Sequence, residues 1–369
     1  MSVLEAVRIS FSGPIVVGGP HVTNVSLDYL RRTLGGATYV VRGDGEGIMC
    51  RLLDGDAPHE VPGVHPLDGS ATGSPPAIYL RIEELPLIDR RFSEGEPVHR
   101  LGGAWYGLTM SRGCKFRCSF CSGSVHSNGM PYRADADAAV REIEHLVGLG
   151  ATGIRLVDDL PFLGKKALYS FLKTVSATVP KRLAWDINFP LQYCKTVTAE
   201  EWRMLRRLGL ETVTLGVESA DESLRSALGK RIHSADLELT IEALLDNGVA
   251  VKLYFIIGTP GERASSSRDT VDLAVSLSRL AADPAYVDCN VFIYKPMPGS
   301  RLWTELCEGG YTETDLLAYA DFELTETEFQ KHAWRSSQKL AELPPDDLTA
   351  LVDAFYQRGS HTAALRATN

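Results

Sequence analysis

The sequence lacks the features that mark membrane-spanning, exported and nucleic-acid-binding proteins. None of its apolar runs reaches the roughly 18 residues that a membrane helix requires. The opening residues show no basic segment followed by an apolar stretch and a small-residue cleavage site, which a signal peptide would contain. The net charge is −9, whereas nucleic-acid-binding proteins usually carry a basic surface. We therefore expect a cytoplasmic protein that has neither a membrane nor a nucleic acid as its partner.

Cysteine is scarce and odd in number, which argues against a disulfide framework. The 369 residues include seven cysteines, whereas disulfide-rich scaffolds are short and usually carry an even number. Three of the seven, Cys114, Cys118 and Cys121, fall close together in the sequence. Their clustering predicts a metal site.

Strand-like and helix-like segments alternate regularly between residues 105 and 300. The runs that predict strands are 106–110, 154–157, 183–189, 212–217, 251–257 and 287–294. Helical patterns separate them, and this alternation is typical of a parallel α/β sheet, either a doubly wound sheet or a barrel. We divide the chain into an α/β unit at 1–56, a linker at 57–104, the alternating region at 105–300 and a helical region at 301–369.

Polar residues and a glycine-rich turn follow the predicted strands at the point where each strand ends. In chain order they are Asp158 and Asp159, Asn188, Glu218 and Ser219, and the turn with Gly258 and Pro260. The carboxyl ends of parallel strands meet at one edge of the sheet, and ligands bind there in such folds. We therefore expect these residues to lie together.

The three clustered cysteines define the most informative segment, residues 111–121. Soft thiolate ligands bind iron–sulfur clusters, zinc or copper(I). A [4Fe–4S] cluster usually takes four cysteines, so three would leave one iron open for chemistry with a cofactor or substrate. The alternative from a different class is a zinc-binding interaction module, in which His126 supplies the fourth ligand.

The Cys-x3-Cys-x2-Cys spacing, with Phe120 before the last cysteine, resembles the radical S-adenosylmethionine (SAM) superfamily. Three later stretches resemble it as well: Gly-Val-Glu-Ser at 216–219, Phe-Ile-Ile-Gly-Thr-Pro-Gly-Glu at 255–262 and Lys-Pro-Met-Pro-Gly-Ser at 295–300. The resemblance implies a partial (β/α)6 barrel of the TIM type. It also implies a [4Fe–4S] cluster on Cys114, Cys118 and Cys121 whose open iron binds SAM, and a 5′-deoxyadenosyl radical that abstracts hydrogen from substrate.

The same resemblance implies which residues contact SAM and what else the enzyme needs. Val157-Asp158-Asp159 stands where the family more commonly has Gly-Gly-Glu, and Asp158 and Asp159 would bind the amino end of the methionyl part. An electron donor such as flavodoxin or ferredoxin would reduce the cluster. The remaining predicted cofactor contacts are Phe120, Ile256, Gly258 and Pro260 near the adenine, Glu218 and Ser219 near the ribose or methionyl part, and Asn188.

The N-terminal unit resembles the last third of a cobalamin-binding domain, which many radical SAM enzymes carry before the barrel. The matching stretches are Val-Val-Gly-Gly-Pro-His at 16–21 and Tyr-Val-Val-Arg-Gly-Asp-Gly-Glu at 39–46. The earlier strands of such a domain have no counterpart, and a sheet needs several strands to bury a face. We therefore expect a truncated cap that does not bind cobalamin.

Without cobalamin, the expected reaction is one that a substrate radical undergoes by itself. We expect a redox-neutral reaction such as decarboxylation of a sugar- or nucleoside-like small molecule in antibiotic biosynthesis, with a cobalamin-dependent methyltransferase as the alternative. Strand alternation places Lys252 and Tyr254 on one face of the fifth strand, and we predict that both act in catalysis. Trp185, Asp186 and Lys295 are further candidates for facing the substrate.

Overall fold

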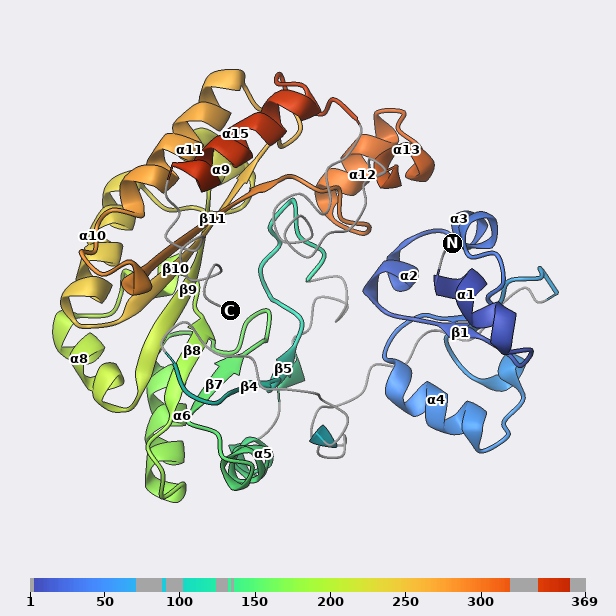
Figure 1. The fold of residues 1–369 in the computed structure, drawn as a ribbon, viewed down its shortest axis with the longest axis horizontal. Helices are drawn as coiled ribbons and strands as arrows, with labels where there is room; N and C mark the ends of the chain where they lie inside the picture. The colour runs from blue at the N-terminus through green and yellow to red at the C-terminus, as the bar shows by residue number, and fades with distance from the viewer. Residues whose placement is uncertain are drawn as a thin grey trace.

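The main sheet has six parallel strands arranged in chain order. The computed structural model describes residues 3–70, 88–90, 102–123, 132–133, 136–318 and 338–358. Across the sheet the order is β4-β7-β8-β9-β10-β11, so each strand pairs with the next one along the chain (Figure 1). A doubly wound sheet would reverse its order at a switch point. The order therefore confirms the partial (β/α)6 barrel.

The six strands lie close to the predicted segments. They are β4 (Trp105–Leu108), β7 (Gly153–Leu156), β8 (Ala184–Asn188), β9 (Leu210–Glu218), β10 (Ala250–Ile257) and β11 (Val287–Ile293). Burial alternates along β10: Leu253, Phe255 and Ile257 are fully buried, whereas Lys252, Tyr254 and Ile256 are half-buried. This period of two separates an outer face packed under helices from an inner face.

Helices cover the outer face of the sheet (Figure 1). The Thr198 hydroxyl accepts a hydrogen bond from the Glu201 amide and the Glu201 carboxylate accepts one from the Thr198 amide, which is the predicted capping box. The helices of this region are α5 (Ala136–Gly148), α6 (Lys165–Thr178), α7 (Leu191–Cys194), α8 (Ala199–Arg207), α9 (Glu222–Ala227), α10 (Ser234–Asp246) and α11 (Ala264–Leu277).

The N-terminal lobe is a small α/β unit built on a three-stranded sheet, in the order β1-β2-β3. Its elements are α1 (Val3–Ser10), β1 (Val16–Val17), α2 (Pro20–Asn24), α3 (Leu27–Thr33), β2 (Tyr39–Val41), α4 (Gly45–Leu53) and β3 (Val64–Pro66). Strand β3 pairs antiparallel with β2, so the small sheet extends beyond the predicted boundary at residue 56.

The C-terminal helices join the lobe to the barrel. They are α12 (Arg301–Glu308), α13 (Glu313–Leu317) and α15 (Pro345–Gln357). Leu30 and Val40 of the lobe share a buried apolar cluster with Trp303, Leu306 and Leu316. Helix α15 packs on α11 and β11. The described part of the chain contains no helix long and apolar enough to cross a membrane.

Candidate active site

The three cysteines lie on the loop that follows β4 and the short strand β5 (Ser111–Arg112). The charge of Cys118 raises the pKa of both Cys114 and Cys121, and the charge of Cys114 raises that of Cys121. No group of three or more His, Cys, Asp or Glu residues in the described part of the chain is arranged to hold a single metal ion. A four-iron cluster is larger than one ion, and its ligands need not converge on one point. This result therefore does not bear on a cluster held by the three thiols, and His126 of the zinc alternative lies outside the described residues.

In the absence of metal, burial favours the protonated form of these three thiols. It raises the pKa of Cys114 and Cys118, and it raises the pKa of Cys121 to about 11. A cluster would therefore have to displace three thiol protons on binding. Lys230 opposes the effect of burial, because its positive charge lowers the pKa of Cys114 and Cys118.

The cysteine loop is fastened to two other segments of the chain. The Ser119 amide donates to the Leu228 carbonyl at 3.1 Å, and the Leu302 amide donates to the Ser119 carbonyl at 2.8 Å. Gly229 has a φ of +93°, and a Cβ there would lie 3.1 Å from the Cα of Cys118. Only glycine allows this close approach without strain, so the segment after α9 holds the loop in place.

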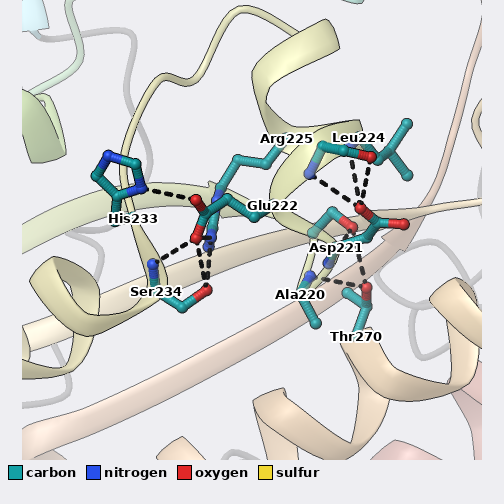
Figure 2. Close-up of polar contacts among 10 residues, drawn as sticks. Ala220, Asp221, Glu222, Leu224, Arg225, His233, Ser234 and Thr270 are labelled. Atoms are coloured by element: carbon teal, nitrogen blue, oxygen red, sulfur yellow. Dashed lines mark hydrogen bonds and ion pairs between the residues drawn. The ribbon is translucent and has the colours of Figure 1, made fainter.

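A polar network fixes the segment that carries Leu228 and Gly229 (Figure 2). Asp221 accepts hydrogen bonds from two amides in the first turn of α9. Glu222 accepts from the Ser234 amide and lies 2.6 Å from His233 Nδ1. The fully buried Arg225 donates to the Ser234 hydroxyl at 2.8 Å. These bonds tie α9 to the start of α10, so the segment between them has little freedom to move.

The two adjacent aspartates after β7 have different roles. Asp158 is 2% exposed and accepts hydrogen bonds from the Met110 amide at 3.0 Å and the Ser111 hydroxyl at 2.5 Å. Asn188 donates to the Asp158 carbonyl at 2.9 Å. Asp158 thus braces the start of the cysteine loop.

Asp159 lies beside the cysteines instead. A Cβ on Gly123 would lie 3.3 Å from the Cys121 sulfur and 3.4 Å from the Asp159 carboxyl carbon. Asp159 is exposed, and its charge raises the pKa of both Cys114 and Cys121. Of the two aspartates, Asp159 is therefore the one placed to meet a ligand of the cluster.

Asp158→Asn should change how stability depends on pH. Burial raises the pKa of Asp158 to about 6, above its unfolded value of about 3.9. The folded state therefore binds more protons, and its stability falls as pH rises from about 4 to about 6.5. Over this range the wild-type free energy of unfolding should fall by about 2–3 kcal/mol relative to Asp158→Asn, as measured by urea denaturation. Parallel pH profiles for the two proteins would contradict the assigned burial.

Glu218 occupies the most unusual backbone position in the described part of the chain. It is the only non-glycine residue described there with a positive φ, at 70°. The register between β9 and β10 shifts at this point, because Tyr254 pairs with Gly216 and Phe255 pairs with Glu218. Such a bulge re-aims a side chain, and strained conformations of this kind cluster at functional sites.

The bulge directs Glu218 to Lys230. Their carboxylate oxygen and ammonium nitrogen are 3.0 Å apart, and the side chains are 5% and 23% exposed. A Cβ on Gly216 would collide with the carboxylate and would lie 2.7 Å from Lys230 Nζ. Burial alone would lower the pKa of Lys230, but Glu218 and Cys118 together outweigh it and raise that pKa. The sequence interpretation missed Lys230, which lies outside the motif at 216–219 that contains Glu218.

Ser219 and Gly258, two other predicted cofactor contacts, interact with neighbouring residues of the protein itself. The Ser219 side chain is fully buried, lies 3.3 Å from the Thr270 hydroxyl and accepts from the Asp221 amide. Gly258 has a φ of +80°, and a Cβ there would lie 2.6 Å from Leu348. Pro260 is half-buried on the same turn. Ser219 and Gly258 thus shape the edge of the barrel.

Phe120 and Ile256 belong to the same apolar region of the structure. Both pack against the apolar cluster that contains Tyr294 and Trp303. Phe120 comes from the cysteine loop and Ile256 from the inner face of β10. An apolar surface therefore lies next to the cysteines.

The inner face of the barrel carries the two predicted catalytic residues. Lys252 Nζ lies 5.5 Å from the centre of the Tyr254 ring, and Tyr254 packs edge-on against Phe292 of β11 at 5.5 Å. Asp186 also lies on this face and pairs with Arg155 at 2.9 Å. The prediction for Trp185 is wrong: it is 1% exposed and packs against Phe171 of α6. Adjacent strand residues face opposite sides, so Trp185 points away from Asp186.

The N-terminal lobe contacts the start of the cysteine loop. Arg112 pairs with Asp44 at 3.0 Å and with Glu46 at 2.5 Å. Beside this pair is a cavity of about 360 Å³ between lobe and barrel. Its lining comes from Gly19, Pro20, Thr23, Gly43, Asp44, Gly45 and Glu46 of the lobe, and from Thr109, Ser111, Arg112, Gly113, Val157, Asp158 and Asp159 of the barrel.

Comparison with known proteins identifies the barrel. Residues 108–274 match the sequence family described as the radical SAM superfamily. The chain contains a radical SAM domain. Its fold agrees with that of the radical SAM methyltransferase TsrM from Kitasatospora setae, solved with cobalamin and a [4Fe–4S] cluster bound. The TM-score is 0.61 at 18% identity, over 85% of this chain and 61% of that one.

Two curated relatives are similar over most of this chain. An uncharacterized methyltransferase of Pyrococcus horikoshii is 26% identical over 78% of this chain and 62% of its own length. An anaerobic magnesium-protoporphyrin IX monomethyl ester cyclase of Cereibacter sphaeroides is 27% identical over 79% of this chain and 48% of its own length. The chain thus spans about half to three fifths of the length of these relatives.

Proposed function

We propose that this protein is a radical SAM enzyme that acts on a small molecule. The observation that carries the proposal is the set of three thiols on the loop after the first barrel strand, beside the partly buried Glu218–Lys230 pair. A bound cluster would supply the electron that cleaves SAM, and the protein would supply position and exclusion of water. Cys114, Cys118 and Cys121 would hold the cluster, and Asp159 would bind the amino end of SAM.

The inner face of the barrel supports a binding site for the substrate. Lys252 would pair with an anionic group, and the Tyr254 and Phe292 rings would pack against an apolar part of the substrate. Ile256 lies on the same face of β10, toward the end of the strand, and it packs against the same apolar cluster as Phe120 of the cysteine loop. Substrate and SAM would therefore be bound next to each other.

Methyl transfer is a better proposal for the reaction than decarboxylation. The Pyrococcus relative and the structural neighbour TsrM are named as methyltransferases, and the other relative is a cyclase. Neither relative nor TsrM is named as a decarboxylase, so the predicted decarboxylation has no support from them. We propose a cobalamin-dependent methyltransferase that modifies a carbon atom of its substrate.

In this proposal, cobalamin would bind at the cavity between the N-terminal lobe and the barrel. A Cβ on Gly19 or on Gly45 would meet no heavy atom within 4 Å, so both glycines expose backbone to open space. Glycine at such positions allows a cofactor to approach the chain closely. The residues present thus fit a ligand between lobe and barrel, where cobalamin would supply a methyl carrier. This proposal replaces the expectation that cobalamin is not bound.

Cobalamin retention tests this part of the proposal. After incubation with hydroxocobalamin and gel filtration, the wild-type protein should retain about one equivalent, as read from visible absorption. Gly45→Phe should lose most of it, because the ring fills the cavity. Gly148→Phe, where a side chain also meets open space but on α5, is the matched control and should retain it. Equal retention by both variants would place cobalamin elsewhere.

Product mass distinguishes the two reaction types. Anaerobic turnover with cobalamin, reductant and trideuteromethyl-SAM should add about 17 mass units to the substrate, against about 14 with ordinary SAM. A mixture of small carboxylic acids and heteroaromatic compounds serves as the probe. Loss of about 44 mass units would instead identify a decarboxylase.

A further inference from the structure

Three charged side chains join the N-terminal lobe to the cysteine loop. The Arg112 guanidinium lies 3.0 Å from an Asp44 carboxylate oxygen and 2.5 Å from a Glu46 carboxylate oxygen. A second contact with Glu46, at 3.4 Å, makes that pair bidentate. The side chains of Arg112, Asp44 and Glu46 are 30%, 17% and 45% exposed, so water and salt screen them only in part. We call these contacts the lobe–loop ion pairs.

Asp44 makes this contact in place of its usual local one. It is the N-cap residue of α4, where an aspartate ordinarily accepts hydrogen bonds from amides in the first turn. In the described first turn of α4 its side chain caps no amide, and its carboxylate lies beside Arg112 instead. This part of the lobe is therefore arranged for a contact with the barrel.

Arg112 lies next to the first cysteine and to a fixed point of the barrel. Its neighbour Ser111 donates to the buried Asp158 carboxylate. On the other side, only Gly113 separates Arg112 from Cys114. A shift of Arg112 would therefore move the first of the three proposed cluster ligands.

The cavity of about 360 Å³ between lobe and barrel touches both sides of the lobe–loop ion pairs. Asp44 and Glu46 line it from the lobe, and Arg112 and Gly113 line it from the barrel. A ligand that fills the cavity would contact both partners of the pairs at once. It would thereby hold the lobe and the start of the cysteine loop in one arrangement.

The lobe has a second attachment, which does not involve the cysteine loop. Leu30 of the lobe shares a buried apolar cluster with Trp303 and Leu316, and the Ser26 amide donates to the Glu313 carboxylate at 2.8 Å. Loss of the lobe–loop ion pairs should therefore leave the lobe in place. Anchoring of the lobe is thus not a sufficient reason for the pairs.

We propose that Arg112 is a positioning residue that couples the cavity to the cluster: a ligand bound between lobe and barrel fixes the cysteine loop through the lobe–loop ion pairs and so tightens the binding of SAM. The inference rests on the proposed function, in which cobalamin binds in the cavity and SAM binds at the cluster. By thermodynamic linkage, SAM should tighten the binding of cobalamin by the same factor.

The affinity for SAM with and without cobalamin tests the proposal. The reconstituted holoenzyme is equilibrated anaerobically with radiolabelled SAM in a dialysis cell, either alone or with hydroxocobalamin at a concentration that saturates its visible absorption change. In the wild type, cobalamin should tighten SAM binding at least about fivefold. In Asp44→Asn/Glu46→Gln this effect should fall below about twofold, because Arg112 loses both charged partners. Both substitutions lie in the lobe, so they leave the cysteine loop itself unaltered.

Variants of Arg112 address the same contact from the barrel side. Arg112→Met should also lose the effect, and adding it to Asp44→Asn/Glu46→Gln should cause no further loss, because all three substitutions break one interaction. Arg112→Lys keeps a positive charge between the two carboxylates and should recover part of the effect. The matched control is Glu313→Gln, which removes a carboxylate from the other attachment of the lobe and should keep an effect of at least about fivefold.

The outcomes separate this inference from the proposed function. A wild type that retains cobalamin but binds SAM equally well with and without it would overturn the inference alone. Undiminished coupling in Asp44→Asn/Glu46→Gln would also overturn it, and would indicate direct contact through Asp159, which lines the same cavity. Equal loss of coupling in Glu313→Gln would overturn it as well, because general loosening of the lobe would then explain the effect. A wild type that retains no cobalamin would instead refute the proposed methyltransferase, and this inference with it.

Discussion

Cys118→Ala should remove the cluster and SAM cleavage together. After anaerobic reconstitution, the wild type should hold about four irons per chain and the variant less than about one, because two thiolates cannot retain a cluster that normally has at least three. Formation of 5′-deoxyadenosine should then fall to the background rate. Iron analysis and visible absorption check the first result, and chromatography of the quenched reaction checks the second.

Cys289→Ala is the matched control for this experiment. Cys289 is buried on β11, away from the cysteine loop, so its loss should leave the iron content unchanged even if stability falls. A Cys118→Ala protein that keeps a full complement of iron would show that these thiols are not the ligands. Stoichiometric zinc in the wild type would favour the interaction module.

Lys230→Met should have the second largest effect. It leaves Glu218 buried without its partner and removes the positive charge beside Cys118. Breaking a buried ion pair on one side typically costs about 3–5 kcal/mol; because Lys230 is partly exposed, we expect a loss of about 2–4 kcal/mol in the free energy of unfolding. We also expect 5′-deoxyadenosine formation to slow at least about 100-fold.

A double variant separates the structural role of the pair from its role at the cluster. Lys230→Met/Glu218→Gln should recover part of the lost stability, because no unpaired charge remains buried, but it should not recover activity. The midpoint potential of the cluster should be lower in Lys230→Met, since a nearby cation favours the reduced state. In the double variant it should lie closer to the wild-type value, because the opposing charge of Glu218 is removed as well. Wild-type activity and potential in Lys230→Met would show that the pair serves only the fold.

The barrel was predictable because its strands are buried on a regular pattern. Runs such as 251–257 are apolar on the outer face, and their boundaries follow from where that pattern stops. The order of the strands was not predictable from spacing, since a barrel and a doubly wound sheet share the same alternation. The alternation of side chains along a strand should have excluded Trp185 as a substrate-facing residue, because Asp186 and Asn188 lie on the opposite face of the strand from it.

The candidate site was only partly predictable because its geometry depends on contacts across the chain. Asp158 and Asp159 are neighbours in sequence but differ in environment. Asp158 is buried and hydrogen-bonded to the start of the cysteine loop, whereas Asp159 is exposed beside the cysteines. Lys230 gave no periodic signal, and its importance follows from a bulge in β9 that turns Glu218 toward it. The ion pairs of Arg112 with Asp44 and Glu46 join segments that no local pattern connects.

The account depends most on the cluster having one iron that no protein thiolate occupies. Mössbauer spectra of the protein reconstituted with iron-57, recorded with and without SAM, measure this directly. We predict that SAM changes the signal of one of the four irons of the cluster and leaves the other three unaltered, as expected for a three-cysteine site. Four equivalent irons that do not respond to SAM would contradict the account.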